Sequence, residues 1–288
     1  MCSRDITERI EGERQRLNYE IEKNEELRRI MEMKDEFLSL ISHEFKTPIA
    51  VIVSAIQAIV NIHGDKLPKR VMTLIQRIKQ NTYRQLRLVN NLLDISRANA
   101  GQLKTNKTNM DIIFLTKSIV ESVSEYAMQK DLKLIFLSDV THKVIGVDEE
   151  KYERILLNLL SNAIKFTPPG KSIEVIILDN DDKICIKIRD EGIGIPIEKQ
   201  ALVFERFGQV DSSLSKQAEG SGLGLTIVKL LVEALSGSIQ LHSIEGEGTT
   251  FTIQLPGNYV CESEEKQFEA IDSRLVQAIS IELSDIYY

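Results

Sequence analysis

The residues from Phe37 to Ile49 read FLSLISHEFKTPI, and they begin the pattern that decides the fold of the first part of the chain. Apolar residues recur at steps of three, four and seven, which marks one helical face: Ile41, Phe45, Ile52, Ile56 and Ile59. His43 lies two residues from Ile41 and Phe45, about 200° around the helix, so we expect it to point away from that face. Such a histidine, followed by the carboxylate of Glu44, is placed for reactivity, although a merely solvated histidine is the alternative.

Two long helices are expected here, joined by a short turn. Pro48 cannot donate a helical hydrogen bond to the Glu44 carbonyl, so the first helix should bend just after His43. It should end near Gly64 to Pro68. The second helix carries its own apolar stripe: Val71, Leu74, Ile75, Ile78, Val89, Leu92 and Leu93. One αα-hairpin cannot bury both stripes, which predicts a homodimeric four-helix bundle.

The charged segment before the hairpin carries a weak seven-residue repeat: Ile10, Leu17, Asn24, Met31 and Leu38. This repeat predicts a parallel two-stranded coiled coil in which Asn24 would fix the register. A single solvated helix is the alternative.

Composition excludes several classes of protein. The 288 residues are 42% hydrophobic and 27% charged, as in a soluble protein with room for two modest domains. A net charge of −7 with both signs interspersed argues against nucleic-acid binding. Three scattered cysteines fit a reducing cytosol, and there is no run of about 18 apolar residues that would span a membrane. We therefore expect a cytoplasmic location.

After a polar linker at 103–109, short β-branched runs alternate with helices. The predicted strands are Lys133–Leu137, Lys143–Val147, Ile173–Leu178, Ile184–Ile188, Ser238–His242 and Thr249–Leu255. Turns are expected at 180–182 and 246–248. The pattern predicts an α+β sandwich, with a mostly antiparallel sheet under helices.

The helix expected from Tyr152 to Phe166 is apolar except for one stripe. Asn158, Asn162 and Lys165 follow at steps of four and three, so they share a face. Amide and amine groups in such a row suit phosphates with Mg²⁺, a hard ion that takes oxygen ligands. Satisfied core amides are the alternative.

Two glycine-containing segments complete the candidate site. Strand alternation turns Asp190 toward the core, where an adenine amino group would be a suitable donor, and Gly192 and Gly194 would let a flat base approach the backbone. The alternative is a tight turn capped by the aspartate. Gly220, Gly222 and Gly224 precede a helix whose N-terminus would attract an anion, after a polar segment, 208–219, typical of a lid. Neither a Rossmann fingerprint nor a Walker loop is present.

These motifs, in this order, resemble those of the bacterial sensor histidine kinases of two-component systems. His43–Pro48 resembles the phosphoacceptor box of a HisKA-type dimerisation domain. The segments 158–166, 190–194, 204–207 and 220–224 resemble the asparagine, first glycine, phenylalanine and second glycine boxes of a GHKL-type ATP-binding domain. The resemblance covers about Phe37 to Pro256, and no key residue is missing.

The resemblance implies catalytic roles in the hairpin. His43 would take the γ-phosphoryl group of ATP and pass it to an aspartate of a response regulator's receiver domain. Glu44 would orient or accept the imidazole proton. Thr47, one turn after His43, would orient a water that hydrolyses the phosphorylated regulator, which implies a phosphatase activity.

It also implies roles in nucleotide binding. Asn162 would hold Mg²⁺, Asn158 would support the phosphates or metal, and Lys165 would add positive charge. Asp190 would bind the adenine amino group. The glycines at 220, 222 and 224 would permit lid closure, and the linker would serve as the hinge for the domain.

The expected organisation has four parts: a signalling coiled-coil helix (1–36), the phosphotransfer hairpin (37–103), the ATP-binding domain (104–257) and a tail without assigned role (258–288). The segment Arg4–Arg9 looks like the one that follows a PAS sensor, so the sensor would precede this chain. Two rival interpretations stay open: a GHKL-type ATPase clamp without phosphotransfer, which has no use for the His43 hairpin, and a non-catalytic dimerisation module, which has no use for the nucleotide motifs.

Overall fold

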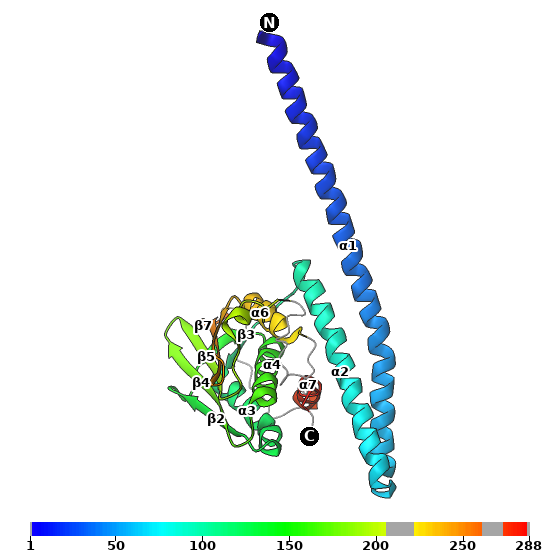
Figure 1. Cartoon of the computed structure of the whole chain (residues 1–288), viewed down its shortest axis with the longest axis vertical. Helices are drawn as coiled ribbons and strands as arrows, with labels where there is room; N and C mark the ends of the chain where they lie inside the picture. The colour runs from blue at the N-terminus through cyan, green and yellow to red at the C-terminus, as the bar shows by residue number, and fades with distance from the viewer. Residues whose placement is uncertain (1, 206–221, 261–272, 287–288) are drawn as a thin grey trace.

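The computed structural model describes residues 2–205, 222–260 and 273–286 of the chain. A single long helix, α1 (Cys2–His63), passes through Pro48 without interruption. After a short 3₁₀ turn, η1 (Gly64–Lys66), α2 (Lys69–Asn99) returns along the lower part of α1 (Figure 1). The predicted hairpin and its turn are therefore confirmed, and Pro68 stands immediately before the second helix.

Within a single chain, α2 covers a different face of α1 from the apolar face named from the sequence. Ile49, Val53 and Ile56 are buried, at steps of four and three. Of the five residues named from the sequence, only Ile56 is buried, Ile41 is half-buried, and Phe45, Ile52 and Ile59 are exposed. Helix α1 carries two adjacent apolar stripes, and α2 covers only one of them. Burial of the other stripe in a dimer stays a prediction.

The second part is an α/β layer built on a five-stranded sheet. Its elements are β1 (Thr108–Asp111), α3 (Ile112–Gln129), β2 (Lys133–Ser138), β3 (Val144–Val147), α4 (Glu149–Phe166), β4 (Ser172–Asn180), β5 (Lys183–Asp190), α5 (Ile197–Gln200), α6 (Gly224–Ala234), β6 (Ser238–Ile244), β7 (Gly248–Pro256) and α7 (Ser273–Glu282). The strand order is β2-β4-β5-β7-β6, antiparallel except for the β2–β4 pair. All six predicted strands and both turns are confirmed.

The expected hinge is shorter than the sequence indicated. Thr108 and Asn109 belong to β1, which pairs with β3. Asn109 is buried and exchanges two hydrogen bonds with the backbone of Val260. Asn106 donates its backbone N–H to Asp148. The last residues of the linker are therefore part of the second domain, because they form hydrogen bonds with its backbone and with Asp148, the residue that caps α4.

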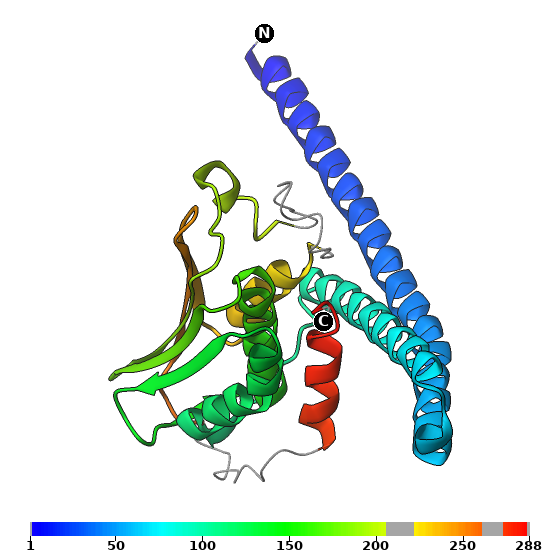
Figure 2. The ribbon, with the colours of Figure 1, turned by 60° about the horizontal axis from the view of Figure 1, so that its bottom comes forward.

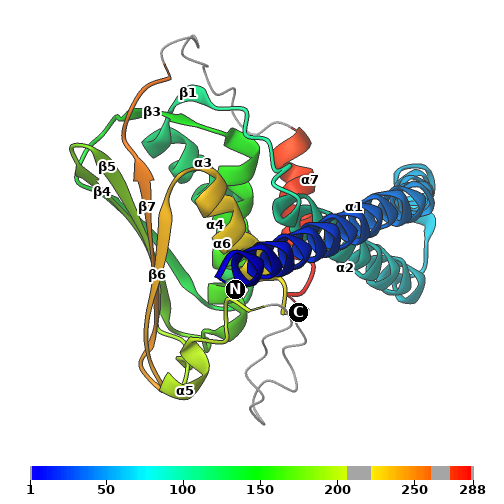
Figure 3. The same cartoon turned by 90° about the horizontal axis from the view of Figure 1, so that it is seen from above.

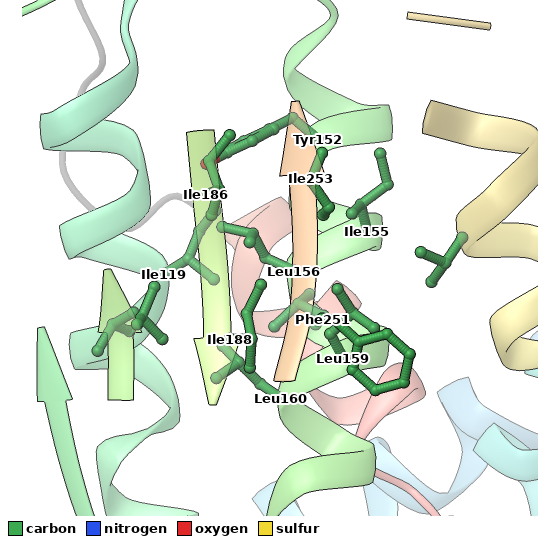
Figure 4. Packing of buried hydrophobic residues seen from close by; sticks show 14 of the residues in the cluster. Ile119, Tyr152, Ile155, Leu156, Leu159, Leu160, Ile186, Ile188, Phe251 and Ile253 are labelled. Carbon is green, nitrogen blue, oxygen red and sulfur yellow. The ribbon is translucent and has the colours of Figure 1, made fainter. Parts of the chain in front are cut away.

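Helices α3, α4 and α6 cover the sheet face that is turned toward the hairpin (Figure 3). Alternate residues of β5 and β7 point into this layer, including Ile186, Ile188, Phe251 and Ile253 (Figure 4). They meet the apolar side of α4, formed by Ile155, Leu156, Leu159 and Leu160. This burial fixes α4 on the sheet and leaves its opposite side to carry polar groups.

Both ends of α4 are capped. Asp148 accepts a hydrogen bond from the backbone N–H of Lys151 at 3.1 Å. At the other end, the Lys130 ammonium donates to the carbonyl oxygens of Ile164 and Lys165, at 2.6 and 2.7 Å. The register and orientation of the helix are thereby held at both termini.

A buried hydroxyl pair beneath α4 gives an asymmetric stability prediction. Thr116 donates to the Ile112 carbonyl, so Tyr152 must donate to Thr116 Oγ1, 2.7 Å away. Thr116→Val leaves the buried Tyr152 hydroxyl without this partner and should cost about 1–3 kcal/mol, whereas Tyr152→Phe should cost about 1 kcal/mol. Chemical denaturation followed by circular dichroism measures both. A larger loss for Tyr152→Phe would contradict the assigned donor direction.

Candidate functional site

The three residues of the polar stripe of α4 differ in how far they are buried. Asn158 is buried, whereas Asn162 and Lys165 are half-buried. Asn158 Nδ2 donates to the Arg154 carbonyl at 2.9 Å and to Glu282 Oε2 at 3.0 Å. These two bonds use both amide hydrogens, so the carbonyl oxygen of the side chain points elsewhere.

Asp190 ends β5 with its side chain turned inward, as predicted. Its Oδ1 accepts hydrogen bonds from the backbone N–H groups of Gly192, at 2.9 Å, and Thr249, at 3.2 Å. Burial raises the pKa of this carboxyl to about 6, and the two amides oppose that rise. One carboxylate oxygen is thus fixed by backbone, and the other is left to face the site.

The turn after Asp190 requires glycine. Gly194 has a φ of +67°, and a Cβ there would lie 2.0 Å from the Ile244 carbonyl oxygen. A Cβ at Gly192 would lie 2.9 Å from the Phe166 carbonyl oxygen. The approach at Gly192 seats the turn against the C-terminal end of α4, and the approach at Gly194 seats it against the end of β6. Asp190 therefore lies beside the end of α4 that carries the polar stripe.

The N-terminus of α6 faces the same stripe. Gly222 has a φ of +67°, and α6 begins at Gly224, where a Cβ would lie 3.0 Å from Asn158 Oδ1. Thr226 donates its hydroxyl to the Glu205 carbonyl at 3.1 Å, which ties α6 to the phenylalanine box. Gly220, the predicted lid at 208–219, and the last two residues of that box lie outside the described residues.

The phosphoacceptor residues lie on α1. The backbone of His43 is helical, and its side chain is outside what the structure describes. Glu44 and Thr47 are exposed. Burial lowers the pKa of Lys46, while the nearby carboxylate of Asp94 on α2 raises it.

Arg154 of α4 connects the second domain to the helical hairpin. Its guanidinium forms an ion pair with Asp94 and donates to Asn91 Oδ1 at 2.7 Å, both on α2. A third contact, from Nε to Glu282 Oε1, is 3.3 Å long. Sequence reasoning missed Arg154, although it lies one turn before Asn158 and extends the same polar stripe. It also missed Thr249 and Glu282, whose partners are far away in sequence.

The donor set suits a hard cation bound together with phosphates. Within 2–205, 222–260 and 273–286, no three His, Cys, Asp or Glu side chains gather as a metal site. What the site offers instead are the amide side chains of Asn158 and Asn162. Oxygen ligands, few in number, fit Mg²⁺, which keeps several waters and shares phosphate oxygens.

The two parts match two family models. Residues 33–101 match the His Kinase A (phospho-acceptor) domain, and residues 147–258 match the Histidine kinase-, DNA gyrase B-, and HSP90-like ATPase. The chain belongs to the sensor histidine kinase family. The second part of the chain is thus the ATP-binding domain of this family.

Relatives of the kinase share most of this chain. Circadian input-output histidine kinase CikA of Synechococcus elongatus is 32% identical over 225 residues, which cover 77% of this chain and 30% of CikA. Sensor histidine kinase WalK of Bacillus subtilis is 33% identical over 226 residues, covering 77% of this chain and 36% of WalK. The chain therefore spans only about a third of the length of these two relatives.

Two solved structures are also similar to the kinase. Full-length ShkA, in complex with AMPPNP, has a TM-score of 0.65 and 26% identity, over 78% of this chain and 46% of ShkA. The Acinetobacter baumannii histidine kinase AdeS has a TM-score of 0.53 and 26% identity, over 75% of this chain and 98% of AdeS.

One stretch of the kinase, Leu40–Lys66, is long and apolar enough to cross a membrane by length and composition alone. The phosphoacceptor family match covers all of it. Ile49, Val53 and Ile56 within it are buried in the hairpin, so helix packing accounts for these apolar residues. That no part of this chain spans a membrane stays a prediction.

The raised pKa of Asp190 gives a pH-dependent stability prediction. The pKa of this carboxyl is higher in the folded protein than in the unfolded chain. Its contribution to the stability of the fold is therefore fully present below the unfolded-state pKa and is lost as the pH rises through about 6. Asp190→Asn keeps an oxygen for Gly192 and Thr249 and has no charge to bury. The variant should therefore be more stable than the wild type at about pH 8, by about 2–3 kcal/mol, and nearly equal at about pH 4.

Thermal and urea unfolding of both proteins across this pH range measures the difference. A loss of stability of the same size at every pH would show that the carboxylate is needed for packing, and would contradict the argument.

Proposed function

We propose that the chain binds Mg²⁺-ATP beside α4, transfers the γ-phosphoryl group to His43 and passes it to an aspartate of a response regulator's receiver domain. One observation carries the proposal. The α4 amides, the Asp190 turn and the N-terminus of α6 face one site, on a domain that Arg154 joins to the hairpin carrying His43.

Adenine recognition is assigned to Asp190. Its Oδ1 is held by two backbone N–H groups, so its Oδ2 would accept from the adenine amino group. Gly192 and Gly194 keep the backbone of this turn close to the site, since a side chain at either position would clash. The shape of the turn and the acceptor together would select adenine.

Phosphate binding is assigned to α4 and α6. Asn162, with Asn158 in support, would hold Mg²⁺, which neutralises phosphate charge when bound. Lys165 adds a positive charge, and Gly222 and Gly224, with Gly220 before them, open the N-terminus of α6 toward the anion. These residues orient the γ-phosphoryl group and stabilise its charge, which is most of what phosphoryl transfer needs.

In the transfer itself, the bond between the γ-phosphorus and the bridging oxygen of ATP breaks, ADP leaves, and a phosphorus–nitrogen bond forms at His43. Glu44, the next residue on α1, would orient the imidazole and accept its proton. Thr47 lies one helical turn after His43, so it would reach the same phosphoryl group when the regulator is docked.

Dimerisation is part of the proposal. Phe45, Ile52 and Ile59 on α1 and Leu74 and Ile78 on α2 are each more than 40% exposed in the single chain. A second hairpin would cover them in a four-helix bundle. Such an exposed row exceeds what a monomer usually leaves in water.

The rival nucleotide-driven clamp uses the same ATP-binding domain and needs no histidine hairpin. The match of residues 33–101 to a phosphoacceptor domain supports the kinase over that rival and over a non-catalytic module. A cytoplasmic location and a sensor upstream of Arg4–Arg9 are further parts of the proposal.

Phosphorylation of His43 can be tested directly. Incubation of the purified chain with γ-labelled ATP and Mg²⁺ should label the wild type, and His43→Gln should abolish labelling. The label should survive alkali and be lost in acid, because the phosphorus–nitrogen bond is acid-labile. A second variant, Asp190→Asn, tests the adenine contact. Its side-chain oxygen can still accept from the two backbone amides, but its NH₂ group would face the adenine amino group. Labelling of this variant should fall at least tenfold. Label retained in His43→Gln would identify a different acceptor.

The phosphatase role of Thr47 has a separate test. Thr47→Ala should slow dephosphorylation of the phosphorylated regulator by at least about tenfold, with autophosphorylation changed less than about twofold. Thr73→Ala serves as the control. Thr73 is exposed on α2, and in the described structure its hydroxyl donates only to the Lys69 carbonyl of the same helix. Equal dephosphorylation by Thr47→Ala and wild type would rule this role out.

A further inference from the structure

Helix α7 lies between the ATP-binding domain and the hairpin. Figure 2 shows it, in red, between α4 and α2, and Figure 3 shows the same arrangement from above. Leu275 and Ile279 of α7, with Leu283 and Ile286 just after its end, are buried and join the core of the ATP-binding domain. The C-terminal helix is therefore part of the packed core, although no role could be assigned to this segment from the sequence.

The polar side chains of α7 contact α4. Glu282 is 5% exposed. Its Oε2 accepts from Asn158 Nδ2 at 3.0 Å, its Oε1 lies 3.3 Å from Arg154 Nε, and its carbonyl oxygen accepts from Ser161 Oγ at 3.2 Å. The carboxylate is held by two contacts to α4, and the backbone of the same residue by a third. A buried charge without such partners would be costly, so the carboxylate is held in position.

The bundle holds the same end of α7. Arg87 on α2 donates to the Glu282 carbonyl oxygen at 2.6 Å and forms an ion pair with Asp285. Gln80 donates to the Ile286 carbonyl oxygen at 3.0 Å. The carboxylate of Glu282 therefore has little freedom to move relative to Asn158.

The effect on Asn158 follows from its hydrogen bonds. An amide can rotate by 180° and exchange its oxygen for its NH₂. Here the NH₂ group has two acceptors, the Arg154 carbonyl and Glu282 Oε2, so the flipped state would place an oxygen against two oxygens. The carbonyl oxygen is then held toward Gly224, at the N-terminus of α6. An oxygen held there would be available to Mg²⁺ or to its bound waters, since Mg²⁺ takes hard oxygen ligands.

We infer that Glu282 is a positioning residue for the metal-nucleotide site: it fixes the amide of Asn158 so that the side-chain oxygen faces the Mg²⁺-phosphate group. The inference rests on the proposed binding of Mg²⁺-ATP by this site. The tail of the chain would then complete the ATP-binding domain, and without Glu282 the Asn158 amide would sample both orientations.

The test is equilibrium binding of ATP to the full-length chain, with Mg²⁺ and with EDTA. Glu282→Ala should weaken binding about tenfold in Mg²⁺ and less than about twofold in EDTA, because only the metal-dependent contact loses its orientation. Glu282→Gln, which keeps one acceptor for Asn158, should fall between Ala and wild type.

Two controls separate positioning from packing. Arg274→Ala removes the ion pairs of α7 with Glu149 and Glu153, at the opposite end of the helix, and leaves Glu282 in place. Gln277→Ala changes an exposed residue of α7. Both variants should bind ATP like the wild type in either condition.

Four outcomes would contradict the inference or the function on which it rests. Equal weakening with Mg²⁺ and EDTA, shared by Arg274→Ala, would mean that α7 only supports the fold. Tighter binding by Glu282→Ala would mean that the carboxylate opposes the nucleotide. Wild-type chain that binds no ATP in either condition would overturn the proposed function itself, and wild-type binding that Glu282→Ala leaves unchanged would overturn only the role of Glu282.

Discussion

The structure depends on α4 being buried on one side and polar on the other. Its apolar side lies on the sheet against β5 and β7, and this packing holds the helix in place. Capping by Asp148 and Lys130 fixes both of its ends. Because the helix is rigid, the amides on its other side occupy defined positions, which a metal-phosphate group requires from its ligands.

The same helix connects the ATP-binding domain to the hairpin. Arg154 reaches Asp94 and Asn91 on α2, and Glu282 of α7 lies between Arg154 and Asn158. A movement of α2 relative to α4 would therefore change the surroundings of Asn158 directly. The hairpin and the ATP-binding domain are connected through buried, charged contacts in this arrangement, which gives a change in helix packing a physical route to the site.

Much of the fold could be predicted from the sequence because it depends on local patterns. Alternation placed Asp190 on the inner face of β5, and steps of three and four placed Asn158 and Asn162 on one side of α4. The stripe of α1 named from the sequence is not the one that α2 covers, and periodicity could not separate the two because Phe45 and Ile52 are as apolar as Ile49 and Val53. Periodicity shows that a helix has apolar faces, but the packed neighbour determines which face is covered. Strand β1 was missed because its four residues include a single apolar side chain, Met110.

The sequence by itself determined the two-part organisation, the hairpin, the strands and the motifs of a sensor histidine kinase, since each follows from residue chemistry at short spacing. Only the tertiary structure decided that the tail forms α7 and that Glu282 meets Asn158, a residue 124 positions away along the chain. It also decided which stripe of α1 is buried. The physical reason is the same for each: these contacts form between side chains that only the folded backbone brings together, and no local periodicity encodes their partners.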